Sequence, residues 1–91
     1  MHLHIGGQWV VSLNDIIAIL NIEKLSKANK EFYETAIYNK KLIEIISVKE
    51  AKTCIITPSK VYLSSISSYT LTKRIERFRN ESISNVTLPQ E

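Results

Sequence analysis

The sequence predicts an α+β fold in which two helices pack on a small, mostly antiparallel sheet. Short β-prone runs alternate with turn residues, and two segments have helical periodicity. At 91 residues, with 44% hydrophobic and 23% charged residues, the chain has the size and composition of one globular domain. We expect that domain over residues 1–80, followed by a flexible tail over residues 81–91.

The first part of the chain is typical of a hairpin followed by another strand. Residues 2–5 alternate polar and apolar side chains, and the glycine pair that follows tolerates the positive φ of a tight turn. Residues 9–11 resume the β-prone run. A turn over residues 12–15 precedes residues 16–20, IIAIL, which are predicted as a strand, with a buried helix capped by Asp15 as the alternative.

The first helix is predicted over residues 24–39, where apolar residues recur at three- and four-residue steps. Ser26 is its candidate N-cap, and Asn39 with the lysines that follow closes it. The stripe expected to face the sheet consists of Leu25, Ala28, Phe32, Ala36 and Ile37.

Three more strands are predicted between the helices. Residues 42–48, LIEIISV, are apolar on both faces, and a charged turn leads to residues 53–57, TCIIT. Pro58-Ser59 is typical of a tight turn, so residues 60–63, KVYL, are predicted to return as the next strand. Two helices cover at most one face of such a sheet, and an uncovered face or edge favours self-association.

The last helix is predicted within the stretch 64–79, and it begins after Ser67 or Ser68. A serine cluster at its start offers a cap, at Ser67 or Ser68, for the free N–H groups of the first turn. An apolar stripe with spacings of four and three residues should face the sheet, and it consists of Leu71, Ile75 and Phe78.

This helix also carries the densest group of cations in the chain. Lys73, Arg74 and Arg77 are predicted on a flank away from the apolar stripe. Arginine suits phosphate because its planar guanidinium stays charged and can donate two parallel hydrogen bonds. The alternative is a solvated helix face, which Glu76 within the patch supports.

Charge alone gives little support for nucleic-acid binding, since the net charge is only +3. A second basic element, Lys49 and Lys52, lies in the turn between two predicted strands. These two lysines can extend the basic surface of the helix only if the fold brings both elements to one side of the molecule.

The sequence shows no pattern of catalytic or metal-ligating residues, so we expect no enzyme, no metal and no other cofactor. Cys54, in an apolar strand, is predicted to be buried. His2 and His4 share one face of a strand, but a third metal ligand is missing. Trp9 is either a core anchor or a subunit contact. Without a signal peptide or a membrane-length apolar run, we expect a cytoplasmic protein with no membrane partner.

Three segments, HIGGQWVVSLNDIIAIL (4–20), KTCIITPSKVYLSSIS (52–67) and TLTKR (70–74), carry a family resemblance. Over residues 1–78 the chain resembles the Rem family of bacterial extracellular-matrix regulators, and more closely its RemB-like branch. The resemblance implies a small cytoplasmic protein. It also implies that many copies form a ring, and in the better-studied branch such rings bind DNA and activate biofilm-matrix genes.

The resemblance carries over to individual residues only in part. In the DNA-binding branch a run of arginines precedes the strand that corresponds to TCIIT, and here Glu50 interrupts the lysines at that place. Another arginine of that branch corresponds to Asp15, whose carboxylate would repel phosphate. The register of TLTKR is kept. The candidate DNA-binding residues are therefore Lys49, Lys52, Lys73, Arg74 and Arg77.

We therefore expect a DNA-associated regulator of extracellular-matrix or biofilm genes that acts as a ring-like homo-oligomer. Each copy offers a few cations, and the ring multiplies them into many contacts with double-stranded DNA of low sequence specificity. The alternative is a ring-forming protein-interaction module, with a paralogous regulator as a possible partner and no DNA binding of its own. Asp15 and Glu50 in otherwise basic positions favour this alternative.

Overall fold

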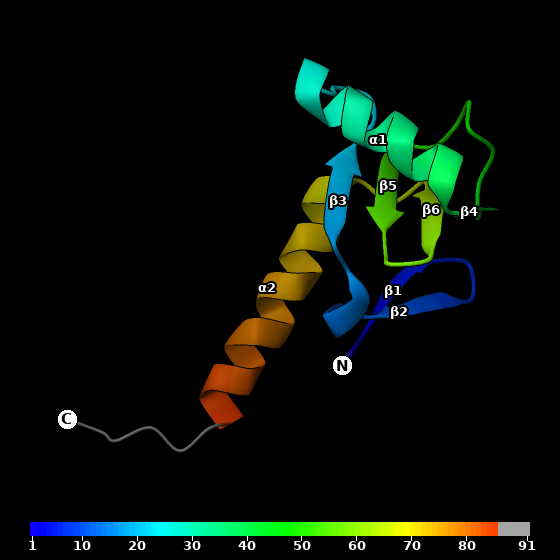
Figure 1. Ribbon diagram of the computed structural model, residues 1–91. Coiled ribbons are helices and arrows are strands. Elements are labelled where there is room, and N and C mark those ends of the chain that lie inside the picture. Colours follow the sequence, from blue (N-terminus) through cyan, green and yellow to red (C-terminus); the bar gives the residue numbers. More distant parts are fainter. Residues whose placement is uncertain (86–91) are drawn as a thin grey trace.

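The computed structural model has three layers, with a four-stranded sheet in the middle (Figure 1). It describes residues 1–85, and side chains for residues 1–80. The α+β class with two helices is confirmed over these residues. The elements are β1 (His2–Gly6), β2 (Trp9–Ser12), the 3-10 turn η1 (Leu13–Asp15), β3 (Ala18–Asn21), α1 (Lys27–Asn39), β4 (Lys41–Glu44), β5 (Thr53–Ile56), β6 (Lys60–Ser64) and α2 (Ser68–Asn85).

The strands form two sheets, whereas the sequence predicted one. β1 and β2 form a separate antiparallel hairpin, and the larger sheet has the order β3-β5-β6-β4. Its β3–β5 and β5–β6 pairs are antiparallel as predicted, but β4 runs parallel to β6. The reason is the crossover through α1, which returns the chain to the end of the sheet where β3 began, so that β4 runs in the same direction as β3.

The glycine pair makes the turn of the β1–β2 hairpin. Gly6 and Gly7 have φ values of +130° and +54°, which glycine adopts without strain. A Cβ atom at Gly6 would also lie 3.3 Å from the Cγ2 atom of Ile45. Glycine at this position therefore lets the hairpin pack closely under the loop after β4.

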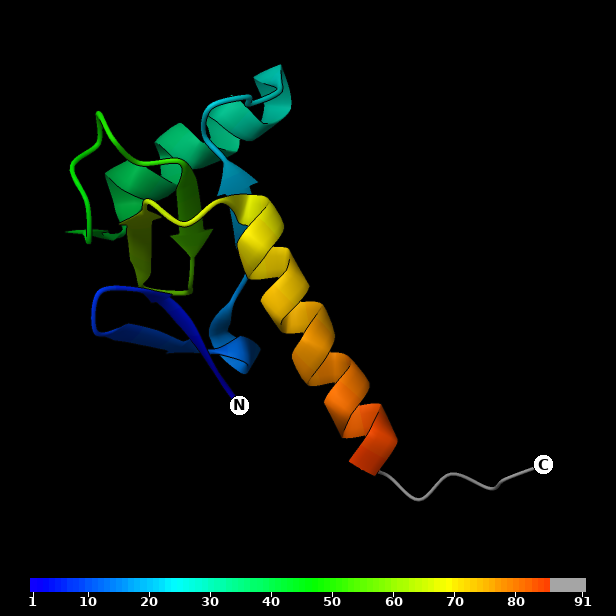
Figure 2. The ribbon, with the colours of Figure 1, turned by 180° about the vertical axis from the view of Figure 1, so that it is seen from behind.

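Each face of the larger sheet buries its own apolar cluster. α1 covers one face, where Cys54, Ile56, Val61 and Leu63 pack around Ala36. The hairpin and α2 cover the opposite face. Figure 2 shows that α2 continues well past the edge of the sheet. Both faces are thus covered in the described part of the chain, so of the uncovered face or edge that the sequence predicted only the edges, β3 and β4, remain.

The helix α1 contacts the sheet through a different stripe from the one predicted. Ala36 is buried and Ile37 half-buried as expected, but Phe32 is 42% exposed and Ala28 is exposed. Tyr33 packs against the core in place of Phe32. The cap is as predicted, because the side chain of Ser26 accepts a hydrogen bond of 3.1 Å from the N–H of Asn29.

Several element boundaries differ from the prediction. β4 ends at Glu44 instead of residue 48, because the backbone bends at residues 45–46. Residues 13–15 form the 3-10 turn, so the following strand begins at Ala18. α2 runs to Asn85, past the expected start of the tail at residue 81. The rest of the predicted tail, residues 86–91, lies outside the described residues.

Candidate nucleic-acid interface

The helix α2 is held on the sheet by its cap and its apolar stripe. The side chain of Ser67 accepts a hydrogen bond of 3.1 Å from the N–H of Thr70, so Ser67 is the N-cap. Leu71 is fully buried, and Ile75 and Phe78 pack half-buried against the same cluster. This stripe, predicted from spacing alone, fixes which flanks of α2 face solvent.

Arg74 does not lie on the solvent flank where the sequence placed it. Its Nη1 atom donates a hydrogen bond of 2.9 Å to the backbone oxygen of His4, and the residue is half-buried. The ring of His4 in turn hydrogen-bonds the Gly7 oxygen through Nε2, at 2.7 Å. Arg74 therefore ties α2 to the β1–β2 hairpin, and its guanidinium is partly occupied within the fold.

Lys73 and Arg77 lie one helical turn apart on the exposed side of α2. Tyr69, which is 71% exposed, precedes them by one turn. The Nζ atom of Lys73 lies 5.5 Å from the ring centroid of Tyr69 and 3.4 Å from a carboxylate oxygen of Glu76. Tyr69, Lys73 and Arg77 thus form one row, called here the α2 row, in which Glu76 partly neutralises one cation.

The structure brings Lys52 to the start of this row. Lys52 lines a small hollow of about 100 Å³ together with Tyr69, Ser67 and Ser68 at the first turn of α2. Its backbone N–H donates to the oxygen of Ser64, which fixes the loop beside the helix. Glu23 lines the same hollow and reduces its positive charge.

Lys49 lies elsewhere, on the exposed turn between β4 and β5. None of the contacts given by the described side chains joins it to α2. The fold therefore combines Lys52, Lys73 and Arg77, leaves Lys49 apart and uses Arg74 internally. Sequence reasoning missed Tyr69, although its spacing of four residues from Lys73 was a usable signal.

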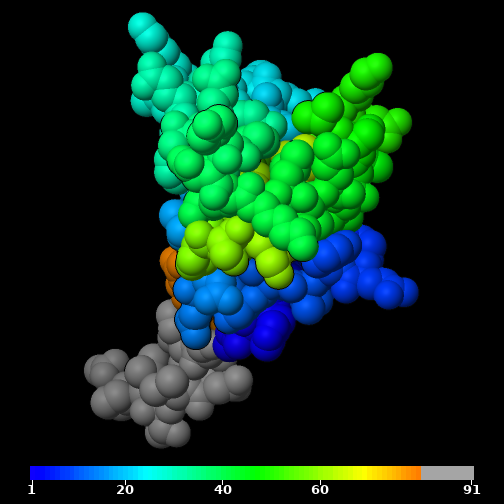
Figure 3. All heavy atoms as spheres, turned by 45° about the vertical axis from the view of Figure 1, so that its right-hand side comes forward, coloured from blue at the N-terminus to red at the C-terminus, as the bar shows by residue number. Residues whose placement is uncertain are grey.

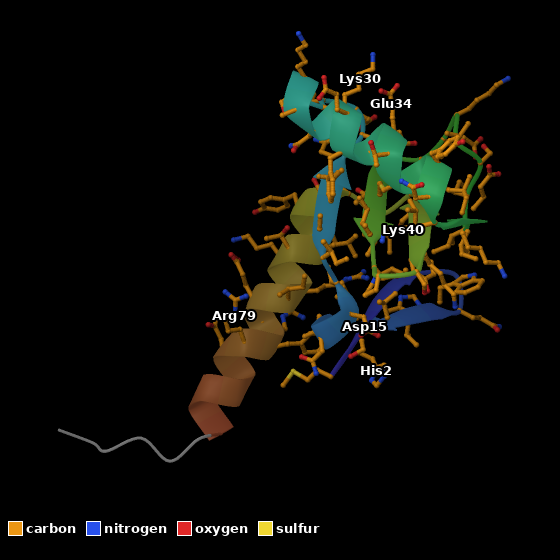
Figure 4. All side chains as sticks on the ribbon, viewed as in Figure 1. His2, Asp15, Lys30, Glu34, Lys40 and Arg79 are labelled. Carbon is orange, nitrogen blue, oxygen red and sulfur yellow. The ribbon has the colours of Figure 1, made fainter. Side chains whose placement is uncertain are left out.

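A groove lies on the other side of α2, between the helix and the N-terminal segment. It has a volume of about 430 Å³ and is lined by Ile75 and Arg79 of α2 and by Met1, Leu13 and Ile16. Arg79 is labelled on α2 in Figure 4, on the part that extends past the sheet. Its side chain is thus exposed on the second half of α2.

A second, more polar groove of about 510 Å³ lies under the β5–β6 turn. Asp15, His2 and Lys60 are among its lining residues, and Figure 4 shows Asp15 and His2 near one another at that end of the molecule. Asp15 is exposed, so a carboxylate stands on this surface. Such a surface does not favour a phosphate backbone.

The remaining candidate residues give no reactive centre within the described side chains. Cys54 is fully buried, as predicted, and burial raises the pKa of its thiol to about 12. His2 and His4 are exposed while Leu3 and Ile5 point inward, which confirms the predicted alternation. Among these residues no three or more His, Cys, Asp or Glu side chains gather as a metal site. Trp9 is 40% exposed and packs edge-on against Tyr62, with ring centroids 5.7 Å apart.

Comparison with known protein families shows which family this chain belongs to. No curated protein matches the chain. Neither helix, as far as the structure describes it, is both long enough and apolar enough to cross a membrane. The family model described as RemA-like, extracellular matrix regulatory protein A-like, matches residues 2–75, which include both sheets and the first turns of α2. The chain therefore belongs to the RemA-like family of extracellular matrix regulatory proteins.

Proposed function

We propose that this protein is a cytoplasmic regulator of extracellular-matrix or biofilm genes that binds double-stranded DNA as a ring-like homo-oligomer. We further propose that it belongs to the RemB-like branch of its family. The family supports the regulatory role. DNA contact and assembly are supported by the arrangement of cations and by the edges of the sheet.

The observation that carries DNA binding is the alignment of Lys52 with the α2 row. Lys52, Lys73 and Arg77 lie in order along one side of the molecule, with Tyr69 between the first two. Each exposed cation can neutralise one phosphate and release its condensed counterion. Three such contacts give weak binding for one copy, so affinity depends on repeating them in an assembly.

Assembly is supported by apolar side chains that remain exposed on different sides of the domain. Val10 and Ile17 are 53% and 55% exposed on the side of the hairpin and β3. Leu42, at 37%, and Val48, at 55%, are exposed on the side of β4. Figure 3 brings the β4 side forward and shows the green residues around β4 at the surface above the blue hairpin. Contacts between unlike surfaces generate closed rings when the rotation closes.

A mobility-shift titration at low salt tests the proposal. The variant Lys73→Ala with Arg77→Ala should bind every duplex at least tenfold more weakly, because each copy in the ring loses two phosphate contacts. The matched control is Lys27→Ala with Lys30→Ala, which removes the same charge from α1, where Figure 4 shows Lys30. Equal weakening in both variants would assign the effect to net charge. Binding that survives unchanged in the first variant would exclude the α2 row.

A second candidate function is that of a protein-interaction module without DNA binding. It is favoured because two of the candidate DNA-binding cations already interact with groups of this protein. Glu76 pairs with Lys73, and the backbone oxygen of His4 takes a hydrogen bond from Arg74. The partner would be another protein, with a paralogous regulator as the first candidate. A stable complex with such a partner in the absence of DNA, together with no mobility shift on any duplex at low salt, would favour this function.

A further inference from the structure

The larger sheet ends in two outermost strands, β3 on one side and β4 on the other. β3 is antiparallel to β5, β5 is antiparallel to β6, and β4 is parallel to β6. It follows that the two outermost strands run in the same direction. An outermost strand offers backbone N–H and C=O groups to any strand that can pair with it.

Neither strand contains a proline or a bulge, although both are only four residues long and β4 begins with Lys41. β3, with the sequence AILN, has no charge and no proline, and the residue before it, Ile17, is 55% exposed. β4 holds the exposed Leu42 between its terminal charges. Natural edge strands are normally protected by lysine, proline, a bulge or a covering element. These two edges are therefore suited to be covered by another chain.

The backbone directions at both edges follow from the hydrogen bonds toward the interior of the sheet. The N–H of Lys41 donates to the oxygen of Ser59, so the backbone groups of Leu42 point away from β6. The N–H of Ile22 donates to the oxygen of Lys52, so the groups of Ile19 and Asn21 point away from β5. In a parallel ladder one residue bonds to two residues of the facing strand that lie two positions apart. Leu42 can thus lie opposite the Ile19–Asn21 pair.

We propose that β4 of one copy pairs in parallel with β3 of the next copy, so that the sheets of neighbouring subunits are continuous. This inference rests on the proposed ring and assigns its subunit contact. Because each copy offers β4 on one side and β3 on the other, the contact joins unlike surfaces and repeats head to tail. The α2 row then recurs at the same height on every subunit.

The common direction of β3 and β4 favours the parallel orientation. Parallel pairing gives every copy the same orientation, as a closed ring of identical contacts requires. Antiparallel pairing would instead invert each successive copy. A two-fold contact of β4 with β4 would also leave β3 uncovered.

Paired cysteines test this contact directly. Ala18 and Leu42 share the α1 face of the sheet, because their paired residues, Ile56 and Val61, both belong to the cluster under α1. The variant Ala18→Cys with Leu42→Cys, treated with a short bis-maleimide, should give a ladder of covalent multimers on a denaturing gel. The buried Cys54 provides an unreactive background.

Three controls make the result specific. Each single variant alone should give no ladder, and a mixture of the two single variants should give mainly dimers. The pair Ala28→Cys with Leu42→Cys should not crosslink, because the thiol at position 28 lies on the exposed side of α1. If the pair Ala18→Cys with Leu42→Cys fails to fold, Ile19→Cys with Ile43→Cys, which share the opposite face of the sheet, replaces it.

Light scattering on the same samples separates the possible failures. A multimer without a ladder would overturn the β3–β4 contact and leave the ring in place. Dimers formed by Leu42→Cys alone would replace it with a two-fold β4 contact. A single species of 10.4 kDa would overturn both the contact and the proposed ring.

Discussion

Replacing Arg74 by alanine should destabilise the fold, whereas the same change at Arg77 should not. The Nη1 atom of Arg74 lies 2.9 Å from the backbone oxygen of His4 and links α2 to the hairpin. Arg77, one turn away, is exposed and has no such bond among the described contacts. The two arginines are therefore a matched pair in which, among residues 1–80, only Arg74 has a structural partner.

The magnitude follows from the type of bond. A hydrogen bond to a charged group contributes about 1.5–3 kcal/mol, and we take about 1 kcal/mol here because the bond lies in contact with solvent. A loss of about 1 kcal/mol lowers the melting temperature of a domain of this size by roughly 4–8 °C. Arg77→Ala should change stability by less than about 0.5 kcal/mol.

Urea unfolding followed by tryptophan fluorescence measures both variants. Trp9 is the only tryptophan and packs against Tyr62 from the hairpin that Arg74 anchors, so its signal reports the affected region. Protomer concentration must be equal in all samples, because the proposed assembly would also stabilise the folded state. Equal stability of the two variants, with DNA binding lost equally in both, would refute the structural role of Arg74.

Three further predictions concern other parts of the molecule. Ser67→Ala removes the N-cap of α2 and should cost about 1 kcal/mol in urea unfolding, while Ser68→Ala, one position along, should cost less; equal losses would place the cap elsewhere. Glu76→Gln frees Lys73 from its 3.4 Å ion pair, so the affinity for DNA should rise a few-fold at low salt with little change in stability, because exposed pairs contribute roughly 0–1 kcal/mol; an unchanged affinity would argue against Lys73 as a contact. The Cys54 thiol, with its pKa raised to about 12, should resist maleimide at pH 8 in the folded protein and react after denaturation, and rapid labelling of the folded protein would contradict its burial. Since the unfolded chain loses this proton first, the free energy of unfolding should fall as the pH rises above about 9.0.

Local patterns predicted the hairpin, both helices and the apolar stripe of α2, because these depend on residues close in sequence. The glycine turn, the Ser26 cap and the Leu71 stripe are of this kind. The separation into two sheets and the parallel β4 depend on how α1 crosses the sheet, and the β-prone runs alone do not state this. Only the order of elements, a strand followed by a helix and another strand, could have indicated that β4 runs parallel to β3, because a helical crossover usually joins parallel strands.

The candidate site shows the same division. The spacing of Lys73 and Arg77 correctly predicts that they share a face of α2. Spacing could not show that Arg74 turns toward a carbonyl some seventy positions away in sequence, nor that Lys52 lies beside the first turn of α2. Both facts arise from the packing of α2 across the hairpin and the sheet.

The salt dependence of DNA binding distinguishes a single bound copy from a bound ring. Each phosphate neutralised contributes about −0.9 to the slope of log affinity against log salt concentration. One copy offers at most the candidates Lys49, Lys52, Lys73, Arg74 and Arg77, for a slope no steeper than about −4.5. The proposed ring should give a steeper slope, because several copies would act together on one duplex. A slope within the range of one copy, or no binding at low salt, would contradict it.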